Sequence, residues 1–296
     1  SANIYEFKEF FPFLTKGKLD IKAIYEQNAS GAKKLDIVGN VKRLASSFAN
    51  CDFIDFDVGI KNLEDLKLER ADITAQSLVS DYGDFKSFSL KAREKDNFID
   101  FVSQIESAEL SLMNLKINSK LFISSLEENH DDRNMNLRFV NDVNGTMGGA
   151  KINTQEPITI IFGKVFSISA PDIKVDDGKL NLDLTLNDSQ VKGNILVTKF
   201  PAAVGSKFLP ASFDQSLISG NAELDGSKSA PVFNSVLEIA KTKSLDKENI
   251  ATVLKLSSYI QNNNLSISAH ALQEDQIIGT LNLQIPCTFS LLPFEF

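Results

Sequence analysis

Apolar and polar residues alternate along most of this chain. From Leu180 to Leu186 every second residue is a leucine, and the residues between them are Asn, Asp and Thr. A β-strand turns successive side chains to opposite faces of its sheet, so this segment predicts a strand with one apolar and one polar face. Comparable segments recur through the sequence, and almost none has the 3.6-residue period of a helix. The pattern therefore predicts an all-β protein.

The alternating segments are clearest in the second half of the chain. Short polar separators divide them, as in sandwiches, barrels and open β-solenoids. Only two segments of this half, 201–209 and 245–260, raise the question of a helix. The first predicts one or two helical turns because a proline begins it, whereas the second is rich in residues that favour a strand. We expect strands at residues 158–162, 165–170, 172–175, 179–187, 190–198, 217–225, 233–240, 250–260, 264–272 and 276–286.

The first half of the chain holds shorter and less regular segments. Two alternating runs within residues 17–43, separated by a polar stretch that contains Gly31, predict a hairpin with a long turn. Residues 98–112 fit a helix or a strand, and their β-branched and serine content favours a strand. Residues 127–136 are the most polar stretch and are expected to form an exposed turn.

The number of predicted strands decides how they can pack. About 20 strands side by side, at roughly 4.8 Å each, would form a sheet on the order of 100 Å long. Twisted sheets of more than roughly ten strands curl or split. We therefore expect one continuous, elongated and curled sheet, an open β-solenoid trough with an apolar interior, built by residues 1–150 and 151–296 together. The alternative is a closed sandwich, in which the same apolar residues form a packed core.

Composition and charge narrow the classes of partner. The chain has 22 Phe, 4 Tyr and no Trp, and Phe needs no hydrogen-bond partner, so a dry surface suits it better than a sugar- or peptide-binding site. An ordinary Phe-rich core is the alternative. The formal net charge is -8. Nucleic-acid-binding proteins carry a basic stripe, and anionic membrane surfaces attract basic segments, so the acidic balance argues against both partners.

Cysteine content and hydropathy add little about the compartment. Two cysteines, Cys51 and Cys287, are too few to indicate a disulfide framework or a metal site. We expect free buried thiols, with a single bridge as the alternative. No apolar run approaches the roughly 18 residues of a membrane span, and no signal peptide is present. The chain is expected to be a soluble piece of a longer protein.

Two histidines and two turn-like segments are the candidates for site chemistry. His130 stands beside two aspartates at a spacing that fits no known metal-ligand set, so a solvated turn is expected. His270 alternates with apolar residues and is expected to face solvent. Residues 145–149 are glycine-rich but lack the Lys-Ser/Thr of a phosphate loop, so they predict a turn, and residues 176–178 predict a hairpin turn. No catalytic arrangement is present, and we expect no enzyme, cofactor or metal site.

A block of motifs within residues 156–240 carries a family resemblance. A proline-apolar-apolar element is followed by Gly-x-x-x-Leu-x-Gly and then by a proline, and this order resembles the TamB family, part of the AsmA-like group of proteobacterial envelope proteins. Residues 279–286 and 290–294 also look like the end-of-module pattern of that family. A Gly-Ser pair departs from the commoner Gly-Thr, and residues 1–150 resemble the family only in style. The matching positions are Pro201, Ala202, Ala203, Gly220, Leu224, Gly226 and Pro231.

The resemblance implies a fold and a function. TamB-like proteins are anchored in the inner membrane, cross the periplasm as a curled β-sheet called a β-taco, and dock on an outer-membrane barrel, TamA. They are implicated in moving phospholipid to the outer membrane and in assembling outer-membrane proteins. This chain would be an internal periplasmic module in a Gram-negative bacterium, and the motif positions Pro201, Gly220, Gly226 and Pro231 would lie at turns.

The expected function is a passive conduit for phospholipid acyl chains. The alternative is a scaffold for outer-membrane proteins that adds strands at its edges, and the same edges predict that the chain associates with itself. A β-helix enzyme or adhesin is disfavoured because no fixed repeat length is seen. The predicted lining of the lipid groove is Ile158, Ile160, Phe162, Phe166, Ile168, Leu180, Leu182, Leu184, Leu186, Leu265, Ile267, Leu281, Leu283 and Ile285.

Overall fold

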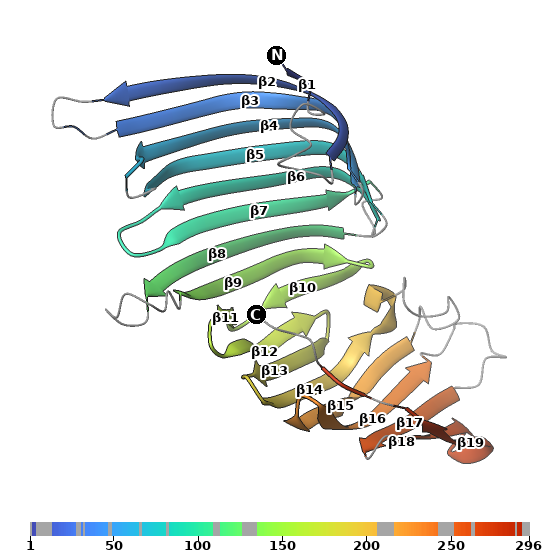
Figure 1. Ribbon diagram of the computed structural model, residues 1–296. Coiled ribbons are helices and arrows are strands. Elements are labelled where there is room, and N and C mark those ends of the chain that lie inside the picture. The colour runs from blue at the N-terminus through green and yellow to red at the C-terminus, as the bar shows by residue number, and fades with distance from the viewer. Residues whose placement is uncertain are drawn as a thin grey trace. The chain divides into compact units, whose positions relative to one another are not determined.

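The computed structural model is built of antiparallel β-strands, as the alternation predicts (Figure 1). Among the described residues, the only helical segment is the short 3-10 turn η2, Ala202–Gly205. No helix in these residues is long and apolar enough to cross a membrane. The structure describes residues 2–3, 14–27, 31, 33–46, 49–64, 67–80, 83–108, 113–125, 135–205, 216–241, 252–261, 264–287 and 289–291.

The chain divides into two units. The first unit comprises Ser1–Phe122 together with Val143–Met147. Its strands from β2 to β8 follow one another side by side in a curved layer, each antiparallel to its neighbour (Figure 1). The strands that contribute to this unit are β1 (Ala2–Asn3), β2 (Leu14–Gln27), β3 (Lys33–Ser46), β4 (Ala49–Asn62), β5 (Lys67–Ser80), β6 (Gly83–Glu94), β7 (Ile99–Ser107), β8 (Met113–Ser125) and the end of β9 (Met135–Met147).

The second unit comprises Ile123–Asp142 and Gly148–Phe296. From β11 onward each strand pairs antiparallel with the next strand in the chain, and β11 also pairs with β9. Its further strands are β10 (Ala150–Thr154), β11 (Ile158–Phe162), β12 (Phe166–Val175), β13 (Gly178–Leu186), β14 (Gln190–Pro201), β15 (Ser216–Ser227), β16 (Ala230–Lys241), β17 (Thr252–Gln261), β18 (Asn264–Gln273) and β19 (Gln276–Pro286).

Most of the predicted elements are found. The segments 158–162 and 276–286 have the observed bounds of β11 and β19. The predicted strands 165–170 and 172–175 are one strand, β12, because the chain stays extended through a register shift that occurs after Ala170. The hairpin predicted within 17–43 is β2 and β3, and residues 98–112 contain the strand β7.

Two helix questions are settled within the described residues. The helix predicted at residues 201–209 is the 3-10 turn η2, directly after Pro201. The segment 245–260, whose residues favour a strand, contains the start of β17 at Thr252. The predicted polar turn at 127–136 lies largely outside the described residues.

The predicted turns are found in part. Asp176 has a positive φ of 52°, and Val175 pairs with Gly178 across the hairpin, as the sequence predicts. The glycine-rich turn 145–149 is shorter than expected, because β9 continues to Met147. Gly145 lies inside that strand with a φ of 152°, where a Cβ would collide with the carbonyl oxygen of Asn114 on β8. Glycine is therefore needed at this position because two strands approach each other closely, and not because the chain turns there.

All four family-motif positions expected at turns lie within the bounds of strands. Gly220 and Gly226 belong to β15, and Pro231 lies in β16 opposite Gly226; only Pro201 stands at a strand end. Gly220 has a φ of 149°, and a Cβ there would collide with the carbonyl oxygen of Val236. The motif glycines thus permit irregular backbone inside a strand, which sequence spacing cannot distinguish from a turn.

Burial in the described residues is shallow. Ten apolar residues are buried, and they include one leucine but no isoleucine or phenylalanine. A closed sandwich would bury such large side chains between its two inner faces. The observed burial is that of apolar side chains packed beside one another on one face of a sheet. The ten residues are Val41, Cys51, Ala75, Ala92, Ala150, Ala170, Val175, Leu186, Val191 and Ala202.

Candidate functional site

The second unit carries an unbroken register of apolar residues across ten strands, which we call the ten-strand row. Residues directly opposite each other in an antiparallel pair lie on the same face of the sheet. Following these partners from β9 through β11 to β19 therefore traces one face. The members of the row are Phe139, Ile160, Ile168, Leu184, Gly193, Leu224, Phe233, Ile260, Leu265 and Ile285.

Gly193 is the one member of the ten-strand row without a side chain. A Cβ at this position would lie 3.0 Å from Cδ1 of Leu184 and 3.6 Å from Cβ of Leu224. The two leucine side chains therefore lie over the glycine from both neighbouring strands. The row stays apolar across β14 although its residue there contributes only backbone.

Parallel rows extend this face along the strands. One runs from Leu180 on β13 to Leu281 on β19 and contains only apolar residues and glycine. Another runs from Leu182 to Leu283 and is interrupted by two serines, Ser235 and Ser258. Their Oγ atoms lie 2.7 Å apart, so the hydroxyl groups bond to each other within the apolar surroundings. We call this surface of the second unit the apolar face.

The opposite surface, the polar face, has a contrasting composition. The row beside the ten-strand row contains serine, threonine, carboxylate and amide side chains and one tyrosine. Ser169 donates a hydrogen bond of 2.7 Å to Asp183 within it. Between these two rows the separation of apolar and polar residues is therefore maintained from β11 to β19. This polar row is Thr159, Ser169, Asp183, Asn194, Glu223, Asn234, Tyr259, Ser266 and Gln284.

All fourteen residues predicted to line a groove lie on the apolar face. Leu186 is buried, nine are half-buried, and four are exposed by 37–50%. The nine are Ile158, Ile160, Phe166, Ile168, Leu180, Leu182, Leu184, Leu265 and Ile267, and the four are Phe162, Leu281, Leu283 and Ile285. The register supplies further members that sequence reasoning missed, although the same alternation marks them: Phe139, Ile195, Val197, Leu224, Phe233, Leu237, Leu254, Leu256 and Ile260.

Three phenylalanine rings stand together at one end of the apolar face. The ring centroids of Phe139 and Phe162 are 5.9 Å apart with an edge-to-face orientation, and those of Phe162 and Phe166 are 5.2 Å apart. Such distances are favourable for aromatic pairs. Because Phe162 is 37% exposed, the cluster presents an aromatic surface to the surroundings.

The first unit repeats the pattern on a smaller scale. A row of seven apolar residues crosses β2 to β8 in direct register, and alternating positions on the other face are mainly polar. The two units thus use the same design for their sheets. The seven residues are Leu19, Val41, Ile54, Ala75, Phe88, Ile105 and Leu115.

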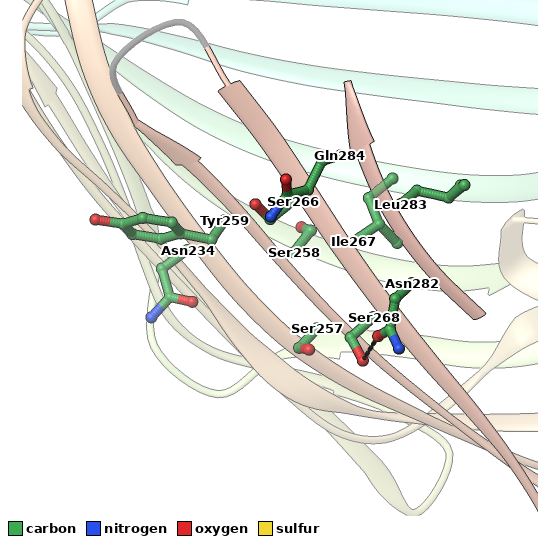
Figure 2. Close-up of a pocket in the computed structure, with 10 residues that line it drawn as sticks. All are labelled: Asn234, Ser257, Ser258, Tyr259, Ser266, Ile267, Ser268, Asn282, Leu283 and Gln284. Carbon is green, nitrogen blue, oxygen red and sulfur yellow. Dashed lines mark hydrogen bonds between the residues drawn. The ribbon is translucent and has the colours of Figure 1, made fainter. Parts of the chain in front are cut away.

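A shallow hollow of about 480 Å³ lies over β16 to β19 (Figure 2). Most of its side chains belong to the polar face, including Asn234, Tyr259 and Gln284. Ser268 donates a hydrogen bond of 2.8 Å to Asn282 across two of the strands. The lining holds no ionisable acid or base apart from the tyrosine, so it offers hydrogen bonds but no catalytic group.

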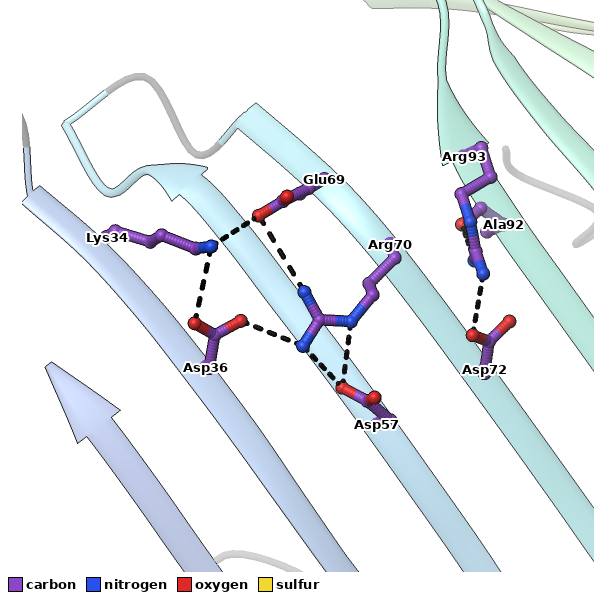
Figure 3. A network of polar contacts seen from close by, with 8 residues as sticks. All are labelled: Lys34, Asp36, Asp57, Glu69, Arg70, Asp72, Ala92 and Arg93. Carbon is purple, nitrogen blue, oxygen red and sulfur yellow. Dashed lines mark hydrogen bonds and ion pairs between the residues drawn. The ribbon is translucent and has the colours of Figure 1, made fainter.

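A charged network lies on the polar face of the first unit (Figure 3). Arg70 on β5 contacts Asp57 at 2.9 Å and Asp36 at 3.0 Å on the two preceding strands. Arg93 on β6 contacts Asp72 at 2.6 Å. The hydrogen bond from Arg93 lowers the pKa of Asp72 below its ordinary value. These pairs bridge neighbouring strands, and we assign them to the alignment of the sheet rather than to chemistry.

The two predicted histidines give no site. His130 lies outside the described residues. His270 lies on the polar face as predicted but is half-buried: its Nε2 is 3.4 Å from Oγ of Ser268, and its buried Nδ1 has no hydrogen-bond partner. No group of side chains in the described ranges is arranged to hold a metal ion.

Both cysteines are free thiols. Cys51 is buried as expected, and its thiol lies 3.3 Å from the carbonyl oxygen of Phe53 and 3.2 Å from that of Gln76. Cys287 is only half-buried, which corrects the expectation for that residue, because it follows the exposed strand β19.

Comparison with known proteins adds no assignment. No family model matches the chain, and neither the curated proteins nor the solved structures contain a significant match. The functional argument therefore rests on the residues and on the geometry of the apolar face.

Proposed function

We propose that this chain is a periplasmic module of a TamB-like protein, and that its apolar face carries phospholipid acyl chains passively from the inner to the outer membrane. The observation that carries the proposal is the ten-strand row. It is a large apolar surface, continuous in register and left half-exposed by the chain itself. Contiguous apolar surfaces of this kind mark sites that bind apolar partners.

The dimensions of the ten-strand row suit a path rather than a single pocket. Nine strand spacings of roughly 4.8 Å give the row a width of about 43 Å. One leaflet of a bilayer holds its acyl chains in about 15 Å, half the hydrocarbon thickness. A bound acyl chain would therefore occupy part of the row, with apolar surface continuing beside it. Movement along the row would not expose the chain to water, at about 0.8 kcal/mol for each CH₂ group kept covered.

In this proposal the lipid contacts the chain through its acyl chains. Acyl chains lie on the apolar face, and the headgroups remain in water. The acidic net charge of -8 does not favour an anionic headgroup, so recognition rests on the acyl chains. The membrane anchor and the docking on a TamA-like barrel that the resemblance implies would belong to other parts of a longer protein.

Lipid binding by two matched charge variants tests the proposal. Leu184→Asp places a carboxylate in the middle of the ten-strand row, and Thr185→Asp places the same charge on the next residue, which lies on the polar face. The purified chain and both variants are incubated with phosphatidylethanolamine and phosphatidylglycerol, and bound lipid is measured by native mass spectrometry and extraction. Circular dichroism confirms that each variant is folded.

We expect the unchanged chain and Thr185→Asp to bind both lipids, and Leu184→Asp to lose most of the binding. Burying an isolated carboxylate among apolar groups is strongly unfavourable, so the acyl chain would be excluded from the row. A folded chain that binds no lipid would refute the proposal. Equal losses of lipid binding in the two variants would also refute it, because they would show that binding does not depend on the apolar face.

A scaffold for outer-membrane proteins is the second candidate function. It is favoured by the outer edge of β19, whose residues are all exposed, because such an edge can accept a further strand. Binding of a synthetic strand from an outer-membrane barrel that survives Leu184→Asp would support this function. Lipid transfer that is unaffected by blocking the edge would support the conduit.

A further inference from the structure

The outer edge of β19 is exposed over its full length. Among the described residues β19 pairs only with β18, and all 11 of its residues are exposed. The segment after it turns back, because the backbone N–H of Leu291 donates to the carbonyl oxygen of Lys228, at the hairpin between β15 and β16. The unpaired N–H and C=O groups of such an edge form a template for another strand.

The regular part of β19, residues 279–285, lacks the features that usually prevent strand addition. Proteins protect exposed edges with charged residues, prolines or bulges. In the first unit, the exposed portion of β2 beyond its pairing with β1 follows this rule, because it carries Lys22 and Glu26. By contrast, β19 contains no charged residue and no proline before Pro286. Its edge is therefore open to a partner strand of matching pattern.

We propose that β19 pairs with β19 of a second copy of this chain, antiparallel, around a two-fold axis at Asn282. In this register Leu281 lies opposite Leu283 of the second copy, and Gly279 lies opposite Ile285. On the polar face Thr280 lies opposite Gln284, and the two Asn282 side chains face each other. Apolar residues of the two β19 strands therefore lie opposite apolar residues, and amide and hydroxyl side chains lie opposite amide and hydroxyl side chains.

The regular part of β19 selects this register. A register shift separates Gly279 from the start of the strand, whereas Gly279 to Pro286 pair with β18 without irregularity. An offset of one residue would place the apolar face of one copy against the polar face of the other. The proposed register uses residues 279–285 and leaves Pro286, which has no N–H, outside the regular pairing. The contact is isologous, so it closes as a dimer instead of growing.

Two opposite charges at the axis test the pairing. Asn282→Lys places two ammonium groups against each other across the axis, and Asn282→Asp places two carboxylates there, so each variant alone is expected to be monomeric. An equimolar mixture is expected to form a heterodimer. Molar mass is measured by size-exclusion chromatography with light scattering, against 32.6 kDa for one chain. Ser266→Lys, on the same face of the inner strand β18, should leave the dimer intact.

A disulfide test fixes the register. In a background with Cys51→Ser and Cys287→Ser, the variant Asn282→Cys should form a covalent dimer on oxidation, since directly opposed positions lie within disulfide reach. Gln284→Cys alone should not, but it should cross-link with Thr280→Cys when the two are mixed. A chain that is monomeric at every concentration would overturn the proposal. Larger assemblies that Asn282→Lys does not alter would overturn it as well, because they would use another edge.

This pairing is independent of the lipid proposal. All four positions substituted on β18 and β19 lie on the polar face, so the strand residues of the apolar face remain unchanged in these variants. A dimer without lipid binding, or lipid binding by a monomer, separates the two proposals.

Discussion

The serine pair inside the apolar face gives a quantitative test of how this face is built. Ser235 is 7% exposed, and its Oγ lies 2.7 Å from that of Ser258, which is half-buried on the next strand. Replacing one serine by alanine removes the hydrogen bond and leaves the other hydroxyl without that partner. A hydrogen bond contributes about 1 kcal/mol, and an unsatisfied buried hydroxyl costs about 1–3 kcal/mol.

We expect each single variant, Ser235→Ala or Ser258→Ala, to lower the free energy of unfolding by about 1–2 kcal/mol. The double variant should lose less than the sum, because both polar groups are then gone from apolar surroundings. The expected coupling energy is about 1–2 kcal/mol, measured by urea unfolding with unchanged m values. Ser257→Ala, on the exposed polar face, is the control and should change stability by less than about 0.5 kcal/mol.

The same double variant tests the proposed function. Removing both hydroxyl groups makes the row from Leu182 to Leu283 apolar throughout. Lipid binding should therefore be kept or strengthened, in contrast to its loss in Leu184→Asp. Single-variant costs that add to the double-variant cost within about 0.5 kcal/mol would refute the coupling. Weaker lipid binding by a stable double variant would refute the reasoning about the face.

Three further predictions concern the architecture. Leu186→Ala, at a position 7% exposed on the apolar face, should cost about 2–3 kcal/mol, whereas Leu196→Ala, 45% exposed on the polar face, should cost less than about 1 kcal/mol in the same urea assay. Gly220→Ala should destabilise the chain by about 2 kcal/mol or more, because its positive φ and the nearby carbonyl oxygen both oppose a Cβ; a neutral effect would contradict this backbone. Asp72→Asn should lower the free energy of unfolding by about 0.5 kcal/mol at pH 7, a small effect because Arg93 and Asp72 are both partly exposed. This difference in stability between the variant and the unchanged chain should vanish as the pH falls through the lowered pKa of Asp72. A difference that persists in acid would exclude the ion pair as its source.

Alternation predicts this fold well because the period of a strand depends on the backbone alone. The four leucines of 180–186 lie on one face, as their spacing requires. The same rule identifies β11 and β19 to the residue. The limits of prediction appear where local backbone departs from the regular strand. Gly145 and Gly220 lie inside strands, and from sequence their glycine is indistinguishable from that of a turn.

The membership of the candidate site required the register. Sequence reasoning placed fourteen residues on one face but omitted the central strands β14 to β17. Leu224, Phe233 and Leu237 show the same alternation, yet only the pairing of strands reveals that they continue the rows of Leu184 and Leu180. The half-exposure of this face among the described residues is likewise a property of packing that no single strand encodes.

The apolar face also helps to select its own register. A shift of one residue between two strands would reverse the faces and is excluded by the alternation. A shift of two residues keeps the faces and must be excluded by particular partners. Gly193 accepts the side chains of Leu184 and Leu224, and such a shift would place a branched side chain against them. The pairing of Ser235 with Ser258 acts in the same way, because a two-residue shift would leave each hydroxyl against apolar groups. The few positions of the apolar face that lack an apolar side chain therefore specify the alignment that keeps the remaining apolar residues in continuous rows.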